Sequence, residues 1–377
     1  VHSSGYRNSC ALSFDPTWNL FANDNDQEGS KFSPCRLLYA PAQSWHGWVR
    51  GWAARLNPGR MDLLPVTNLE LAVPVGQCWY DDTVLGESYR GSILVANWGN
   101  HSISQHKISP DGAGFEAPSV ALLVCDSPMR PVSVIPSNDG RLIAAICYMQ
   151  SNEGSPVRKS DLVIIAPRGQ SFPLQDFSKG PVTDLLNAPW QLRYKAHQEI
   201  LRVGGGPLKK VAKRFRREAP DSPVMPSLMV LAVREGSSKS ISRIRQWTKQ
   251  SVPLTTDALR VAAAFPEMFR DLDIDAIAAR SDEPRRLHAL LEYLHVTATC
   301  TPEVAITLAA HEDPYVRQSA ARLLARLASD EEKTRWSTGD VEHRLAAVLA
   351  AGFRICDAAE ASEAIPQGGQ PAPPEQL

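Results

Sequence analysis

The spacing of hydrophobic and polar positions divides the chain into two parts. Up to about residue 175, short apolar runs alternate with turn residues, as is typical of β-strands. The clearest predicted strands are Ser92–Asn97, Ala121–Cys125, Leu142–Tyr148 and Leu162–Ala166. Turns are predicted at Pro110-Asp111-Gly112 and Asn138-Asp139-Gly140, which have the residues that tight turns need. Many short strands predict a β-propeller or a sandwich, and at about 40 to 50 residues per blade this part would hold three to four blades.

From Val182 onward the pattern becomes helical, rich in Ala, Leu, Arg and Glu. Similar openings recur roughly 30 residues apart, at Asp282–Arg286, Asp313–Arg317 and Asp340–Arg344. In each, Asp can cap the helix that follows, and Pro, where present, suits its first turn. Residues 176–360 are therefore predicted to form HEAT-like helical repeats, and residues 361–377, rich in Pro, Gly and Gln, a disordered tail.

Composition excludes several classes of protein. Among 377 residues, 43% are hydrophobic and 21% charged, and the net charge of −1 gives no global attraction for nucleic acid. The basic run Lys209–Arg217 fits a solvated helix face better than an anion-binding site. No apolar run reaches the roughly 18 to 20 residues that span a bilayer. The seven cysteines include no C-x-x-C pair; free buried thiols are expected, and a Cys10–Cys35 bridge is the alternative in an exported protein.

Motifs in the first part occur in a recognisable order. They are Gly5–Asn8, Leu12–Leu20, Asp24–Gly29, Gly47-Trp48, Tyr89–Asn100, Arg130–Val132 and Asp139–Leu142. This series resembles the sorbosone/glucose dehydrogenase-like propellers, and most closely the planctomycete-type membrane-bound dehydrogenases, which carry C-terminal HEAT repeats. The resemblance implies that residues 1–175 are part of an incomplete six-bladed β-propeller. Because the first motif almost coincides with Val1, we expect the chain to be the C-terminal part of a larger protein.

The resemblance also implies site residues. In the related quinoproteins the Arg-Asn pair of the G-x-R-N motif points into the central funnel and contacts the quinone PQQ or the substrate, a role that would fall to Arg7 and Asn8. A guanidinium is a fixed cation for a carboxylate or an oxyanion, and an amide offers both a donor and an acceptor. Arg130 is a second candidate cation in the funnel. The alternative is that Arg7 and Asn8 only tie neighbouring blades together.

Two further predictions concern a metal and a base. Asp24, Asp26 and Glu28 form an oxygen-rich turn that could hold calcium, although ordinary Asx-turn chemistry explains the same residues. His101 is a candidate for the general base that an alcohol oxidation needs, and packing at a blade edge is its alternative.

Two functions remain open at this point. The resemblance implies a PQQ-type oxidoreductase acting on a sugar or aldehyde and passing electrons to a separate cytochrome, because the chain lacks the C-x-x-C-H of a haem domain. It implies a periplasmic or exported protein, associated with the membrane in some relatives, and we expect the chain alone to be catalytically incomplete. The alternative is a non-catalytic propeller whose HEAT repeats bind a protein partner.

Overall fold

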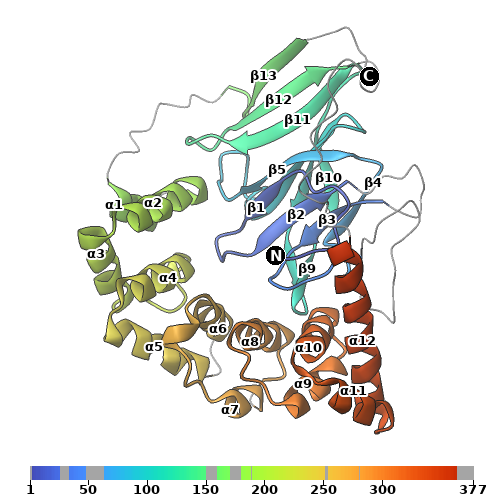
Figure 1. Ribbon diagram of the computed structural model, residues 1–377. Helices are drawn as coiled ribbons and strands as arrows, with labels where there is room; N and C mark the ends of the chain where they lie inside the picture. Colours follow the sequence, from blue (N-terminus) through green and yellow to red (C-terminus); the bar gives the residue numbers. More distant parts are fainter. Residues whose placement is uncertain are drawn as a thin grey trace, which may run out of the picture.

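The structure is a computed structural model of the whole chain. It describes residues 2–25, 34–47, 63–149, 159–169, 180–187, 189–250, 254–279 and 281–362, with side chains up to Phe353 in the last helix. Strands occupy the first part and helices the second (Figure 1).

The β part consists of antiparallel sheets, each built mainly from consecutive strands. The first sheet contains β1 (Leu12–Phe14), β2 (Leu20–Asp24), β3 (Cys35–Tyr39) and β4 (Thr67–Glu70) in that order. The second contains β5 (Pro74–Tyr80), β6 (Ser92–Asn97), β7 (Ser102–Lys107) and β10 (Ser119–Val124), and the third β11 (Met129–Pro136), β12 (Leu142–Tyr148) and β13 (Lys159–Ile165). A small hairpin, β8 (Ser109–Asp111) and β9 (Gly114–Glu116), extends from the second sheet.

The second sheet lies between the other two, with β5 beside both β1 and β11. This position explains the continuous apolar run of β6, all of whose residues are buried. Side chains alternate between the two faces of a strand. Ile93 and Val95 accordingly join a core shared with the first sheet, whereas Leu94 and Ala96 join a second core with the third sheet.

The helices form a curved, two-layered arc around the β part (Figure 1). They are α1 (Pro181–Asn187), α2 (Trp190–Val203), α3 (Gly205–Phe215), α4 (Met225–Glu235), α5 (Ser238–Thr248), α6 (Thr255–Ala264), α7 (Ile274–Ala278), α8 (Pro284–Thr297), α9 (Pro302–Ala309), α10 (Pro314–Leu327), α11 (Asp330–Ser337) and α12 (Val341–Ser362). A short 3₁₀ turn, Pro266–Met268, follows α6. Sheets and arc share one continuous core, which runs from Phe21 in β2 to Phe353 in α12.

Local sequence explains where several helices begin. The Asp313 carboxylate accepts from the backbone N–H groups of Tyr315 and Val316, so that it caps α10, and Pro314 occupies the first turn. Asp340 accepts from the backbone of His343 at the start of α12. Ser329 and Glu332 form a capping box on α11.

The inner side of the arc packs against the chain's own sheets. Gln318 in α10 both accepts from the backbone N–H of Trp45 at 2.9 Å and donates to its carbonyl at 2.7 Å. Arg322, one turn further along α10, donates to the carbonyl of Gln43 at 3.0 Å. Asp313 also accepts from the backbone N–H of Ala113 in the β8–β9 hairpin at 2.8 Å. Helix α10 is therefore tied to the first sheet and to the hairpin by polar contacts as well as by the core.

The coarse prediction of antiparallel sheets followed by helices is confirmed, and each of the four predicted strands overlaps an observed one. The basic run begins on α3 and ends just after it, at Arg216 and Arg217. On α3 the side chains of Leu208, Val211, Ala212 and Phe215 are buried and the lysines are exposed, as predicted. The cysteines in the described part form no disulfide; Cys10 is exposed while Cys35 is buried, and no bridge joins them. No helix in the described ranges is long and apolar enough to cross a bilayer. The predicted tail falls almost wholly outside the described residues.

Candidate functional site

Four candidate residues from the sequence lie toward the same end of the sheets, in two groups that no contact among the described residues joins: Arg7 with Asn8, and His101 with Arg130. The ends of β1, β5 and β11 all lie against α2, since Trp190 donates to the carbonyl of Phe14, Arg193 pairs with Asp81, and Gln191 donates to the carbonyl of Ser137. We call this end the helix-facing rim. Arg7, Asn8 and Arg130 come before or at the beginnings of β1 and β11, at the opposite end, which we call the starting rim.

Arg7 and Asn8 anchor the beginning of β1 through their backbone. Both N–H groups donate to Oδ1 of Asp24, at 3.1 and 2.9 Å. The Arg7 side chain is exposed and donates to the carbonyl of Asn25 at 3.0 Å. The Asn8 side chain is also exposed, and its amide makes no hydrogen bond within the described part of the chain. The backbone of Arg7 and Asn8 thus holds the segment before β1 against Asp24, and the Asn8 side-chain amide faces solvent.

Arg130 spans the second and third sheets at the same rim. Its guanidinium lies 4.1 Å from the centre of the Trp98 ring, and it donates to the carbonyls of Trp98 at 2.8 Å and Met149 at 3.0 Å. His101 lies nearby in the β6–β7 turn with φ of 58°. Its Nδ1 lies 2.8 Å from the carbonyl of Met129 and donates to it, which leaves Nε2 as the other ring nitrogen.

Asp24 makes a structural ion pair. Its Oδ2 lies 2.6 Å from Nη2 of Arg36, and both side chains are almost fully buried. With Oδ1 engaged by the backbone of Arg7 and Asn8, the carboxylate has partners on both oxygens, so it does not fit the role of a calcium ligand. Within the described ranges no group of three or more His, Cys, Asp or Glu could hold a metal ion. Asp26 and Glu28 lie outside the described residues.

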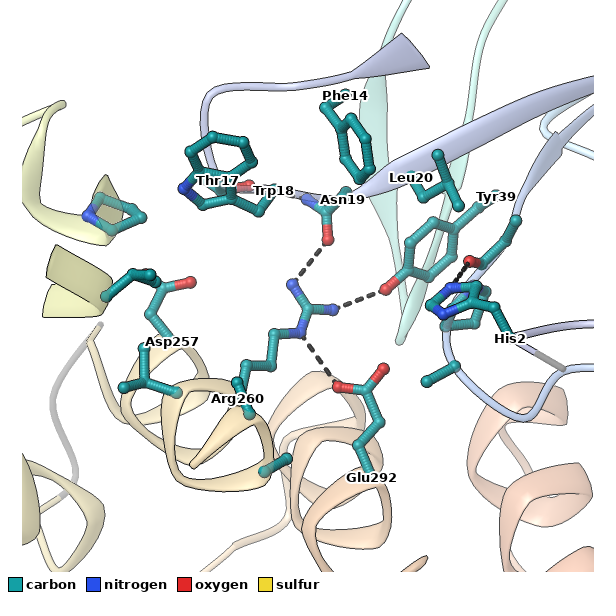
Figure 2. A pocket seen from close by; sticks show the side chains of 18 of the residues that line it. His2, Phe14, Thr17, Trp18, Asn19, Leu20, Tyr39, Asp257, Arg260 and Glu292 are labelled. Atoms are coloured by element: carbon teal, nitrogen blue, oxygen red, sulfur yellow. Dashed lines mark hydrogen bonds and ion pairs between the residues drawn. The ribbon is translucent and has the colours of Figure 1, made fainter. Parts of the chain in front are cut away.

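A cavity of about 420 Å³ lies where the β1–β2 turn faces α6 and α8. Figure 2 shows that Trp18 and Phe14 line it from the sheet side and Asp257, Arg260 and Glu292 from the helices. None of the three cavities described for this protein is lined by Arg7, Asn8, His101 or Arg130.

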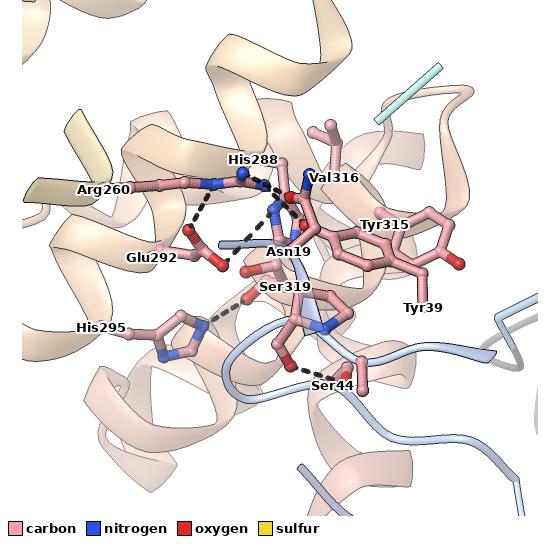
Figure 3. Close-up of polar contacts among 12 residues, drawn as sticks. Asn19, Tyr39, Ser44, Arg260, His288, Glu292, His295, Tyr315, Val316 and Ser319 are labelled. Atoms are coloured by element: carbon pink, nitrogen blue, oxygen red, sulfur yellow. Dashed lines mark hydrogen bonds and ion pairs between the residues drawn. The ribbon is translucent and has the colours of Figure 1, made fainter. Parts of the chain in front are cut away.

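Arg260 links the helices to the first sheet across this cavity. Its two terminal nitrogens donate to Oδ1 of Asn19 and to the hydroxyl of Tyr39, each at 2.6 Å, and its Nε lies 3.4 Å from Glu292 (Figure 3). Glu292 also lies 3.9 Å from Nδ1 of His288. Burial of His288 lowers its pKa, which favours the neutral ring. The pair Arg260–Glu292 is thus charge-balanced and hydrogen-bonded, as a buried ion pair requires.

The β1–β2 turn that faces the cavity is held rigid by Asp15. Its Oδ1 accepts from the backbone N–H of Thr17 at 2.8 Å and of Asn19 at 2.9 Å, and its Oδ2 accepts from the Asn19 amide at 2.7 Å. Burial raises the pKa of Asp15 despite these bonds. The turn places Trp18 at φ of 65°, in the left-handed region that side chains other than glycine rarely adopt.

Sequence reasoning did not identify Trp18, Asp257 or Arg260. Asp15-Pro16-Thr17 signals a turn, but nothing in the chain says that this turn meets a helix some 240 residues further on, where Arg260 bonds Asn19 across a separation of 241. The sequence signal for Asp257 and Arg260 is their spacing of three residues, which puts both on one face of a helix. Such pairs are common on surface helices, so the spacing alone does not indicate a site.

No protein-family model and no curated protein matches the chain. Solved structures that resemble it include a glucose dehydrogenase, with 15% identity, a TM-score of 0.33, and 44% of this chain and 43% of that one covered. Another is a putative oxidoreductase (glucose dehydrogenase) from Thermus thermophilus, at 18% identity and a TM-score of 0.35, covering 44% and 46%.

A third is the PQQ-bound aldose sugar dehydrogenase from Streptomyces coelicolor, at 20% identity and a TM-score of 0.30, covering 44% and 45%. The chain therefore spans less than half the length of these neighbours. The neighbours are glucose and aldose sugar dehydrogenases, but at these identities and TM-scores the likeness does not assign their activity to this chain.

Proposed function

We propose that this chain supplies a cofactor-binding rim of a sugar or aldehyde oxidoreductase of the quinoprotein type. The observation that carries the proposal is the position of Arg7, Asn8 and Arg130 at the end of the sheets opposite to α2. An exposed amide and two guanidinium groups there are donors of the kind that an anionic ligand needs. The order of the sequence motifs, which resembles that of sugar dehydrogenase-like propellers, supports the same conclusion.

PQQ fits this rim by the chemistry of the donors. It carries several carboxylates, and the Asn8 amide and the parts of the Arg130 guanidinium not engaged by carbonyls can donate to such groups. When bound, PQQ would supply the two-electron oxidation itself. The residues of the chain would bind and orient it, and His101 Nε2 is the described nitrogen at this rim that could accept a proton. Calcium has no role in this proposal, because the Asp24 oxygens are already bonded.

The proposal treats the three larger sheets as neighbouring propeller blades and the arc as HEAT-like repeats that support them. The inner helices pack against the sheets, which favours the view that the helices support the sheets. The sugar or aldehyde substrate, a separate cytochrome as electron acceptor, and a periplasmic or exported location belong to the same proposal. They come from the family resemblance and apply to the whole protein.

A protein-interaction scaffold is the second candidate. The capped, repeat-like opening at Asp313 favours it, because arrays of such helix pairs commonly bind partners. The inner side of the arc, however, is occupied by the chain's own sheets. A partner would therefore have to bind the outer helices.

Equilibrium dialysis of PQQ against the purified chain tests the proposal, together with dye-linked oxidation of an aldose and aldehyde panel. We expect saturable PQQ binding that Asn8→Ala and Arg130→Met each weaken about tenfold, since a charge-assisted hydrogen bond contributes about 1.5 to 3 kcal/mol. Arg168→Met is the matched control, because Arg168 is exposed and follows β13 at the helix-facing rim. Absence of saturable PQQ binding would refute the oxidoreductase proposal, whereas dye-linked turnover by this chain alone would contradict the expectation that it is catalytically incomplete.

A further inference from the structure

The cavity beneath Trp18 contains a carboxylate that has no hydrogen-bond or ion-pair partner among the residues that the structure describes. Asp257 lies in the first turn of α6 and lines both this cavity and a smaller one of about 170 Å³ beside it. It makes no hydrogen bond or ion pair within the described part of the chain. Figure 2 shows its side chain between α6 and the β1–β2 turn. Burial raises the pKa of Asp257 to about 6, against a weaker opposing effect of Arg260. Asp257 is half-buried and opens onto the cavity. An ionised carboxylate without an ion-pair partner is costly in such a wall, so Asp257 is a candidate to pair with a cationic ligand.

The neighbouring cations are already bound elsewhere. Arg260 donates to Asn19 and Tyr39 and is matched by Glu292. Arg285, on the side of the smaller cavity, donates to the carbonyls of Gly112 and Gly114. Among the described charged residues of this wall, Asp257 makes no hydrogen bond or ion pair, although Arg260 and Arg285 lie near enough to oppose the rise of its pKa. An anionic ligand would meet repulsion from its carboxylate.

The rest of the wall is mainly apolar and aromatic. Phe14 and Trp18 lie 6.0 Å apart, centre to centre, in an edge-to-face arrangement. Trp18 is further fixed by Trp190, at 5.3 Å, and by His197, at 4.7 Å. Aliphatic side chains, among them Leu20, complete the wall. Aromatic faces attract organic cations, and the rigid Asp15 turn holds the Trp18 ring in place before any ligand arrives.

We propose that this cavity binds a small organic amine with an apolar body, whose ammonium group pairs with Asp257 while the body packs against Trp18 and Phe14. The volume of about 420 Å³ lies in the range of small-molecule sites. A metal ion is not the ligand we infer, because no sufficient set of ligating side chains surrounds Asp257 in the described ranges. The site is separate from the starting rim and does not depend on the oxidoreductase proposal.

Binding should depend on pH through Asp257. The charged groups that face it are Arg260 on its own helix, Asp15 in the β1–β2 turn, and Glu283, Arg285 and Glu292 from the start and length of α8. An amine stays protonated throughout pH 5 to 8, whereas Asp257 gains a proton below about 6. Affinity for the amine should therefore fall as pH decreases below that value.

Calorimetric titration with 2-phenylethylamine, 2-phenylethanol and phenylacetate tests the site, because the three share one body and differ in charge. We expect the amine to bind at least ten times more tightly than the alcohol, and phenylacetate not to bind. Asp257→Asn should remove this preference and flatten the pH profile. Asp221→Asn, at an exposed aspartate remote from the cavity lining, should leave both unchanged.

A second variant tests the location of the site without changing a charge. Ala264→Trp places a large side chain on the cavity wall without altering a charge, and should abolish binding of amine and alcohol alike. Circular dichroism checks that each variant is folded. Equal affinities for amine and alcohol, an Asp257→Asn variant that binds the amine as the wild type does, or no amine binding at millimolar concentration would each overturn the proposal.

Discussion

Replacing Asp257 by Asn should stabilise the protein at neutral pH. The substitution keeps the shape of the side chain and removes a charge that the fold does not pair. The pKa of the carboxyl group rises from 3.8 to about 6 on folding, because burial penalises the ionised form. Each pKa unit corresponds to about 1.36 kcal/mol, so the ionised carboxylate costs the folded state about 3 kcal/mol at neutral pH.

The sign of the pH dependence follows from the raised pKa. Between pH 4 and 6 the folded protein holds this proton more tightly than the unfolded chain, so the wild type loses stability as pH rises through that window. Asparagine does not titrate. The two proteins should therefore have similar stability below pH 4, and the variant should be more stable by about 2 to 3 kcal/mol at pH 7.5.

Urea unfolding of both proteins between pH 4 and 8, followed by tryptophan fluorescence, measures this difference. Asp221→Asn serves as the control and should track the wild type at every pH, because its carboxylate is exposed. A variant that is less stable than the wild type at pH 7.5, or a difference that does not change with pH, would refute the claim that Asp257 is an unpaired carboxylate. Substitution of a residue that serves binding commonly makes a protein more stable, so the expected gain agrees with a binding role for Asp257.

The remaining predictions concern the junction of sheets and helices. Arg260→Met should cost about 3 to 5 kcal/mol in urea unfolding, because it leaves a buried carboxylate and two polar groups unpaired, whereas Arg202→Met on the exposed face of α2 should cost under about 0.5 kcal/mol. Asp313→Ala should lower stability by about 2 kcal/mol, since it removes a helix cap and a bond to the hairpin, and a loss below about 0.5 kcal/mol would contradict this. Gly99→Ala should lower the melting temperature, because a Cβ there would lie 2.6 Å from a backbone oxygen, while Gly206→Ala in α3, with open space around it, should raise it.

The elements that sequence predicts best are those fixed by local patterns. β6 and β12 were predictable because an apolar run of strand length lies between turn residues, and α10 because Asp313 and Pro314 mark its start. These signals act over a few residues, so they do not depend on how the rest of the chain folds.

The candidate sites depend on contacts that no local pattern contains. Arg7 and Asn8 were identified by a motif, but their use as backbone anchors for Asp24 follows from the pairing of β2 with its neighbours. The cavity exists only because α6 is brought against the β1–β2 turn. A tryptophan in a turn and an aspartate in a helix become a site once the fold places Trp18 and Asp257 on the same wall.

The most direct test of the proposed function uses the tryptophan under Arg130. PQQ bound at the starting rim would lie close to Trp98, whose ring is 4.1 Å from the Arg130 guanidinium, and a quinone quenches the fluorescence of a nearby indole. The account predicts a saturable quench on titration with PQQ that Trp98→Phe removes in part, while dialysis still detects the bound cofactor. A quench that is not saturable, or one that is identical in Trp98→Phe and the wild type, would contradict the placement of the cofactor at this rim.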